Sequence, residues 1–114
     1  MKVVNQQRTT VLAHNCRLAK SFWARSRGLL FSAPLAAGEG LLIEPCNSVH
    51  TVMMGYPIDV LFLEKDGRIA HLIKAMPPYR ASRIVWRAHS TLELPAGTAE
   101  RTGTVVGDRL VLEP

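Results

Sequence analysis

The feature that most restricts the fold is the stretch Ile58–Leu63, which is apolar on both faces if it forms a strand. Side chains alternate across a strand, so Ile58, Val60 and Phe62 share one face. Asp59 shares the other face with two leucines. A strand that is apolar on both faces needs cover on both sides. The stretch therefore predicts the central strand of a layered β structure.

Asp59 is the polar exception in this strand. A carboxylate between apolar neighbours must accept hydrogen bonds, pair with a cation or be protonated, because an unpaired buried charge is too costly. We therefore expect a tightly held Asp59 with a structural or orienting role. The candidate partners are backbone N–H groups of the Met53–Tyr56 bend, the His50 ring and one of the arginines.

Most of the remaining chain reads as short strands separated by turns. Strands are expected at Val3–Val4, Thr9–Cys16, Leu41–Ile43, Arg68–Lys74, Thr91–Leu94 and Arg109–Leu112. The Asp66-Gly67 pair predicts a hairpin turn between the central strand and its return strand. Ile69, His71 and Ile73 are expected on one face of that return strand, by alternation.

One stretch, Arg17–Ser26, has a helical pattern. Leu18 and Phe22 are spaced i, i+4, and basic residues occupy the other side. Thr98–Thr102 is expected to be a short helical turn or a loop. The pattern as a whole predicts a mainly β fold in one domain spanning residues 1–114: a small jelly-roll-like sandwich or closed sheet with one short helix near residues 17–26.

Composition limits the class of protein. The 114 residues include 14 basic and 9 acidic ones, which gives a net charge of +5 and favours anionic partners in general. Cys16 and Cys46 form no paired pattern, so we expect reduced thiols. The N-terminal residues lack the apolar core of a signal peptide, and no apolar run approaches the roughly 20 residues that span a bilayer. We therefore expect a cytoplasmic protein without membrane association.

Several short motifs recur in order along the chain and carry a family resemblance. They are G-L-L-F (Gly28–Phe31), G-L-L-I (Gly40–Ile43), P-I-D-V-L-F (Pro57–Phe62), Asp66-Gly67, L-E-L-P-A-G (Leu92–Gly97) and G-D (Gly107–Asp108). Together they resemble the bacterial and archaeal family known as domain of unknown function 192. The resemblance implies one compact β-rich domain, similar to a jelly roll, with a small helix, and it implies no activity.

The chain departs from that family pattern before its central strand. The family usually has an F-W-M-K-N-T-like segment there, whereas this chain has His50–Tyr56, which keeps Met but lacks the Trp, Lys and Asn. His50-Thr51 is typical of a variant branch. Any role that the family's Trp or Lys has elsewhere is not transferred to this protein.

The favoured function is a module that binds a small molecule or peptide, with no metal or cofactor and without catalysis. Its site is expected to be formed by the His50–Met54 loop and the mouth of the sheet, where a few polar groups stand among apolar walls. The candidate ligand-binding residues are His50, Thr51, Met53, Met54, Asp59 and Glu93. The first two would supply hydrogen bonds, the methionines adaptable apolar contact, and Asp59 a charge or an orienting bond.

Catalytic and metal-binding alternatives use overlapping residues. His50 could act as a base with Asp59 or Glu93, although a Glu in a half-buried strand more often points outward. Cys46 and His50 have the residue types for two metal ligands, but a zinc site needs three or four. Adding Asp59 to this pair would give a thiolate, base and orienting group.

A last alternative concerns a basic segment, Arg80–His89. Its arginines are interleaved with Trp86 and preceded by Tyr79, which is a combination that can bind nucleic acid. An ordinary solvated loop or edge strand explains the same residues. Asp108 is interpreted as turn chemistry, with its carboxylate accepting nearby backbone N–H groups.

Overall fold

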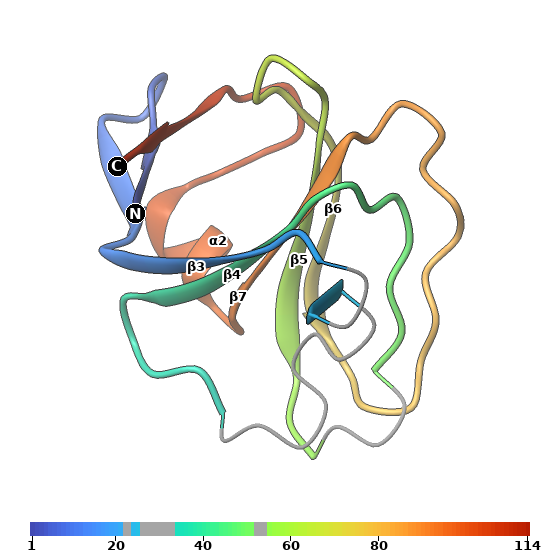
Figure 1. The fold of residues 1–114 in the computed structure, drawn as a ribbon. Coiled ribbons are helices and arrows are strands. Elements are labelled where there is room, and N and C mark those ends of the chain that lie inside the picture. Colours follow the sequence, from blue (N-terminus) through green and yellow to red (C-terminus); the bar gives the residue numbers. More distant parts are fainter. Residues whose placement is uncertain (22–23, 26–33, 52–54) are drawn as a thin grey trace.

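The computed structural model of the protein describes residues 1–21, 24–25, 34–51 and 55–114, and it is mainly β (Figure 1). The strands are β1 (Lys2–Asn5), β2 (Thr10–Ala13), β3 (Asn15–Ala19), β4 (Glu39–Ile43), β5 (Ile58–Leu63), β6 (Ile69–Met76), β7 (Ser90–Pro95) and β8 (Leu110–Glu113). The helix α2 spans Thr98–Thr102. The mainly β fold predicted from the sequence is confirmed. No helix in the described ranges is long and apolar enough to cross a membrane.

The strands form two sheets. One has three strands in the order β2-β1-β8, and the other has five in the order β3-β4-β7-β5-β6. The pair β3–β4 is parallel and the other neighbouring pairs are antiparallel. In Figure 1 the N- and C-terminal strands lie together at one side of the molecule, and segments 44–51 and 77–89 run along the other side.

The five-stranded sheet is covered on both faces, as the apolar pattern of β5 predicts. All six residues of β5 are buried. Leu61 and Leu63 belong to a core cluster that also contains residues of the three-stranded sheet, such as Val3 and Leu110. The residues on the other face of β5 belong to a second cluster that the loops complete, for example through Val85. Sheet packing thus covers one face and loop packing covers the other.

The helix predicted for Arg17–Ser26 is wrong at its start, where the structure has a strand. Arg17–Ala19 belong to β3, where Arg17 pairs with Leu41 of β4. The local i, i+4 pattern did not reveal this pairing, because each partner residue lies 24 positions further along the chain. Ala24 and Arg25 are helical, and residues 22–23 and 26–33 lie outside the described part of the chain.

The return strand β6 carries an irregularity that changes which side chains share a face. The register of β5 and β6 shifts between Phe62 and Leu63, so Phe62 pairs with His71 whereas Leu63 pairs with Ile69. Ile69 therefore packs in the first core cluster and Ile73 in the second. The prediction that Ile69, His71 and Ile73 share a face is wrong for Ile69, because a bulge reverses the alternation there. At the turn itself, Gly67 has φ +90°, and a Cβ there would clash with the Leu110 carbonyl oxygen.

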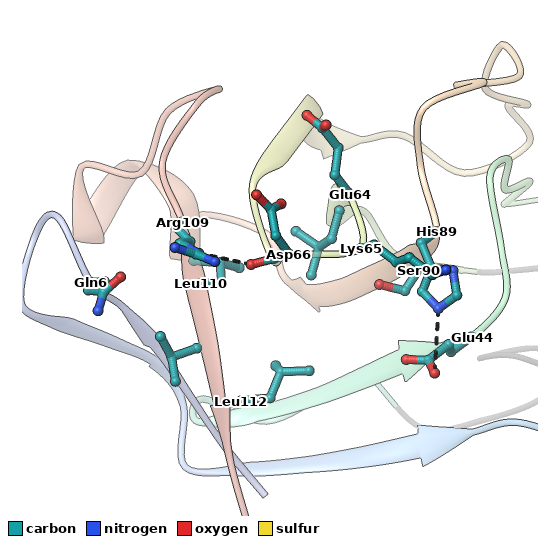
Figure 2. Close-up of a pocket in the computed structure, with 13 residues that line it drawn as sticks. Gln6, Glu44, Glu64, Lys65, Asp66, His89, Ser90, Arg109, Leu110 and Leu112 are labelled. Atoms are coloured by element: carbon teal, nitrogen blue, oxygen red, sulfur yellow. Dashed lines mark hydrogen bonds and ion pairs between the residues drawn. The ribbon is translucent and has the colours of Figure 1, made fainter.

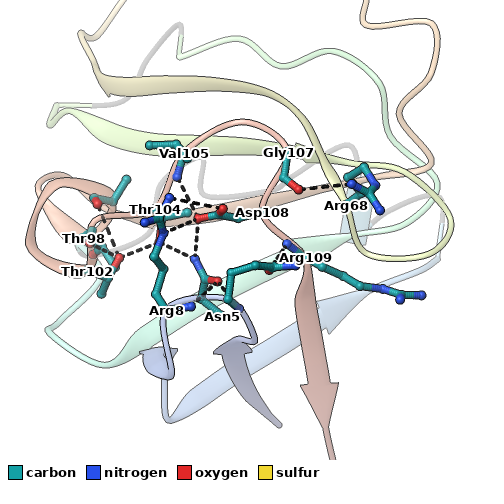
Figure 3. Close-up of polar contacts among 12 residues, drawn as sticks. Asn5, Arg8, Arg68, Thr98, Thr102, Thr104, Val105, Gly107, Asp108 and Arg109 are labelled. Atoms are coloured by element: carbon teal, nitrogen blue, oxygen red, sulfur yellow. Dashed lines mark hydrogen bonds and ion pairs between the residues drawn. The ribbon is translucent and has the colours of Figure 1, made fainter.

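Asp108 does more than complete a turn (Figure 3). Its carboxylate accepts the Val105 N–H, as turn chemistry predicts, and also accepts hydrogen bonds from Asn5 Nδ2 and Arg8 Nε, at 3.0–3.1 Å in each case. Burial alone would raise the pKa of Asp108, but the hydrogen bonds from Asn5, Arg8 and Val105 outweigh it, and the pKa lies below its usual value. The residue ties the N-terminal hairpin to the segment before β8.

Candidate functional site

Thr51 is fully buried and its hydroxyl is already used by the protein. The hydroxyl donates to the Pro77 carbonyl at 2.6 Å and accepts the Arg80 N–H at 2.9 Å. The backbone adds two bonds, from Thr51 N–H to the Arg80 carbonyl and from Tyr79 N–H to the Thr51 carbonyl. These contacts place Thr51 in the role of an anchor for segment 77–80, and they leave its side chain little capacity for a ligand.

Replacing Thr51 with Val is expected to destabilise the protein by about 1–2 kcal/mol. The variant keeps the shape of the side chain but leaves the Arg80 N–H without its acceptor at a partly buried position. Urea denaturation measures the change, with Thr51→Ser as the control that retains the hydroxyl and loses only a methyl group. Equal stabilities of the Val variant and the wild type would contradict an anchoring role.

The other residues expected beside Thr51 do not gather around a described cavity. His50 is exposed and forms an isolated antiparallel bridge with Ala81. Met53 and Met54 lie outside the described residues. The described residues of the predicted ligand site at the His50–Met54 loop therefore do not form a cavity together. A cavity that could hold a ligand lies in another part of the described structure.

Asp59 is fully buried and held by two backbone groups. Its Oδ1 accepts the Ala75 N–H at 2.8 Å, and its Oδ2 accepts the Ala99 N–H at 2.8 Å. Backbone donors were one of the expected partner classes, but these two belong to β6 and α2 and not to the Met53–Tyr56 bend. Asp59 joins the edge of the sheet to the first turn of α2, so its role is structural.

Glu93 is buried on the opposite face of the sheet from Asp59. In the antiparallel pairing of β5 and β7, Glu93 lies across from Val60, whereas Asp59 lies across from Leu94. The two carboxylates therefore point away from each other and form no acid/base pair. The expectation that Glu93 points outward is also wrong, because segments outside the sheet cover this face and leave Glu93 only 5% exposed.

The surroundings of Glu93 favour its neutral form. Burial raises the pKa of Glu93 to about 7, and Oε2 has no hydrogen-bond partner among the described residues. Tyr56 interacts electrostatically with this group. Burial is the larger cause that raises the pKa of the Tyr56 phenol, and the negative charge of Glu93 is the second. The Glu93 side chain is therefore a buried carboxyl that stays protonated at pH values well above the ordinary pKa of a glutamate and loses its proton around pH 7.

Cys46 and His50 do not assemble into a reactive set in the described chain. The Cys46 thiol donates to the Ser48 carbonyl at 3.1 Å, and both Cys46 and Cys16 are free thiols. Both oxygens of Asp59 are occupied by backbone donors, so Asp59 is not placed to orient His50. No group of three or more potential metal ligands occurs among the described residues.

A cavity of about 400 Å³ opens between the two sheets at the end of the molecule that carries the β5–β6 turn (Figure 2). We call it the β8 cavity, because β8 forms one wall. Leu63, Leu110 and Leu112 supply apolar surface. The charged lining residues are Glu44, Glu64, Lys65, Asp66, His89 and Arg109. Its volume lies within the range of small-molecule sites, although its lining is more charged than is usual for them.

Glu44 and His89 form the most polar corner of the β8 cavity. Glu44 Oε1 lies 3.7 Å from His89 Nε2 and 3.8 Å from Lys20 Nζ. Both distances exceed a hydrogen bond, so this oxygen can still accept a donor from a ligand. Across the cavity, Arg109 donates from Nε to the Asp66 carbonyl at 2.9 Å, which fixes the guanidinium at the rim. His89 also borders a hollow of about 290 Å³ beside Cys46.

Sequence reasoning missed this corner. Glu44 directly follows β4, and His89 directly precedes β7, its antiparallel neighbour. The end of one strand and the start of its antiparallel partner lie side by side. The signal that could have joined these two residues is therefore the pairing of β4 with β7, which a single sequence does not reveal.

Comparison with known families agrees with the fold and the motifs. Residues 3–112 match the model of DUF192, a family described as uncharacterized ACR, COG1430. The chain belongs to the DUF192 family. The UPF0127 protein PH1112 of Pyrococcus horikoshii is 29% identical to this DUF192 protein over 111 residues, which cover 95% of this chain and 96% of that one.

Solved structures share the fold. A protein of unknown function from Novosphingobium aromaticivorans is similar with a TM-score of 0.85 and 22% identity, covering 98% of this DUF192 protein and 84% of that chain. A putative transcription regulator from Sinorhizobium meliloti is similar with a TM-score of 0.79 and 26% identity, covering 96% and 89% of the two chains. The family relationship therefore gives a fold and no activity.

Proposed function

We propose that this DUF192 protein is a small-ligand-binding module whose ligand occupies the β8 cavity. The observation that carries the proposal is the corner formed by Glu44 and His89, where a half-buried carboxylate lies 3.7 Å from an imidazole, beyond hydrogen-bond distance. A polar group with unused hydrogen-bonding capacity next to apolar walls is the usual composition of a ligand site. This keeps the binding function expected from the sequence and changes its location.

The charges around the cavity favour a ligand that carries both signs. Three carboxylates, two permanent cations and one histidine line it, although the whole protein has a net charge of +5. Glu44 can accept from an ammonium group, and the Arg109 guanidinium can donate to a carboxylate. An amino acid or a short peptide has both groups and fits a volume of about 400 Å³. We therefore propose a zwitterionic ligand of this class.

The test is an NMR titration of the labelled protein with amino acids and with di- and tripeptides. Binding in the β8 cavity is expected to shift the amide signals of Gly67, Ser90 and Leu110, because these residues line it. Glu44→Gln is expected to weaken binding by about tenfold, through loss of a charged partner. Glu113→Gln, which removes an exposed carboxylate elsewhere on β8, is the matched control.

Two results would overturn the proposal. One is a ligand that shifts signals around Thr51 and leaves those of the β8 cavity unchanged. The other is that none of these ligands shifts any amide signal at millimolar concentrations. The affinity would then be weaker than a specific site of this size provides.

A further inference from the structure

The segment Pro77–His89, which we call the outer segment, exposes large side chains to solvent. Trp86 is 81% exposed and Tyr79 69%, and Ile84 lies between them in the chain at 45%. Aromatic side chains contribute to stability mainly when they are buried, so two strongly exposed ones on one segment indicate an interaction surface. None of these three residues lines the β8 cavity.

The outer segment is also basic. Positions 67–92 contain no Asp or Glu, and the outer segment carries Arg80, Arg83 and Arg87. Arg87 lies 3.4 Å from Glu64, in a pair that is open to solvent. Arg80 and Arg83 have no carboxylate partner among the described residues. The outer segment therefore carries exposed aromatic rings and arginines at neighbouring positions of the chain, with no acidic residue of its own to neutralise the positive charge.

The backbone holds these side chains in place. The outer segment is bonded along its length to segment 47–51: Thr51 N–H donates to the Arg80 carbonyl, Ser82 N–H to the Val49 carbonyl and Val85 N–H to the Asn47 carbonyl. Val85 is buried between the exposed Ile84 and Trp86 and fixes their outward direction. Figure 1 shows the two segments side by side along the edge of the molecule.

Tyr79 is held in a conformation that an aromatic residue seldom adopts. Its φ is +61°, in the left-handed region, and its N–H donates to the Thr51 carbonyl at 3.0 Å. Such a conformation costs free energy, and strain of this kind gathers where a side chain is held for interaction. A preorganised surface loses less entropy when it binds a partner.

We propose that the outer segment binds single-stranded nucleic acid. Bases of a single strand stack on exposed rings such as Trp86 and Tyr79, and the neighbouring guanidiniums contact the phosphates. An anionic membrane fits less well, because insertion needs a contiguous apolar surface and Ile84 is the single exposed aliphatic of the three large side chains. The residues that carry the proposal are Tyr79, Arg80, Arg83 and Trp86, and none of them lines the β8 cavity, so their variants test this function independently of the ligand site.

Fluorescence anisotropy with labelled oligouridylate and oligothymidylate of about 15 nucleotides tests the proposal, since this length covers a typical single-strand site. With three arginine contacts, the slope of log affinity against log salt is expected to be about −2. A fourfold rise in salt should then lower the affinity roughly 20-fold. Stacking on Trp86 should also quench its fluorescence in proportion to binding.

Variants of exposed residues separate stacking from charge without disturbing the core. Trp86→Ala is expected to weaken binding roughly tenfold, whereas Trp86→Phe keeps a ring and most of the affinity. The double variant Arg80→Ala with Arg83→Ala should reduce the magnitude of the salt slope by about 1.4. Arg101→Ala, an exposed arginine on α2, is the matched control and should leave both affinity and slope unchanged.

Three results would overturn the proposal. The first is no salt-dependent binding of either oligonucleotide. The second is an equal loss of binding in the Arg101→Ala control and the outer-segment variants, which would show unspecific attraction to a basic protein. The third is binding to phosphatidylserine vesicles with Trp86 moving into an apolar environment, while the oligonucleotides are not bound.

Discussion

Replacing Glu93 with Gln is expected to stabilise the protein by about 3 kcal/mol above pH ~8 and to have little effect below pH ~4.5. The folded-state pKa of Glu93 is about 7, against an ordinary value of 4.5. The folded protein therefore holds a proton that the unfolded chain releases. The stability that this proton contributes is complete below pH 4.5 and is lost as the pH rises to about 7, where the buried carboxylate becomes charged. Gln is neutral throughout, so it avoids that loss.

Denaturant melts of the wild type and the Gln variant from pH ~4 to ~9 measure this difference. The difference in the free energy of unfolding between the variant and the wild type should grow by about 1.4 kcal/mol per pH unit between the two pKa values. Above the folded-state pKa it should become constant. The control is Glu113→Gln, which neutralises an exposed carboxylate and should leave the shape of the pH profile unchanged. Parallel wild-type and Glu93→Gln profiles over the whole range would refute a buried, proton-holding Glu93.

Replacing Asp59 with Ala is expected to destabilise the protein by roughly 2–6 kcal/mol. The change leaves two backbone N–H groups without their acceptor, the part-buried one of Ala75 and the buried one of Ala99, and each loss costs roughly 1–3 kcal/mol. Asp59→Asn should cost about half as much, because its amide oxygen still accepts one donor while its NH₂ group faces the other. The order of stability is therefore wild type, then Asn, then Ala.

Urea denaturation gives these free energies of unfolding, and hydrogen exchange of the two alanine amides locates the effect. Both amides should lose protection in the Ala variant, and one of them in the Asn variant. Asp66→Asn is the control: Asp66 is an exposed carboxylate in the β5–β6 turn that accepts only a local N–H, so its loss should cost less than about 1 kcal/mol. Wild-type stability in both Asp59 variants would show that the carboxylate is not needed to join β6 to α2.

Local patterns predicted the parts of the fold that depend on local chemistry. Alternation within Ile58–Leu63 identified a strand covered on both faces, and the cost of a buried charge identified Asp59 as a held residue. The Asp66-Gly67 pair identified the turn between β5 and β6. In each of these cases the deciding interaction is either within the segment or required of any buried group, so a single sequence is sufficient.

Non-local pairing decided the parts that the sequence did not reveal. Arg17–Ala19 form a strand because β4 lies beside them, and the register shift beside Ile69 depends on β5. Glu93 is buried because other segments cover that face of the sheet, although its own strand pattern is ambiguous. The corner of Glu44 and His89 needs two strand ends to meet. Spacing along the chain contains none of these relations.

The pairing of β1 with β8 has a consequence for the order of assembly. Val3 lies across from Leu112, and the Asn5 side chain donates a hydrogen bond to Asp108. The three-stranded sheet can therefore form completely only after β8 has been synthesised. Until Leu110–Glu113 has been made, the five-stranded sheet lacks part of the layer over one of its apolar faces. A nascent chain halted before that point would expose this face, and such exposed surface is what chaperones recognise and what promotes aggregation. Pairing of β8 with β1 is therefore what completes the three-stranded sheet.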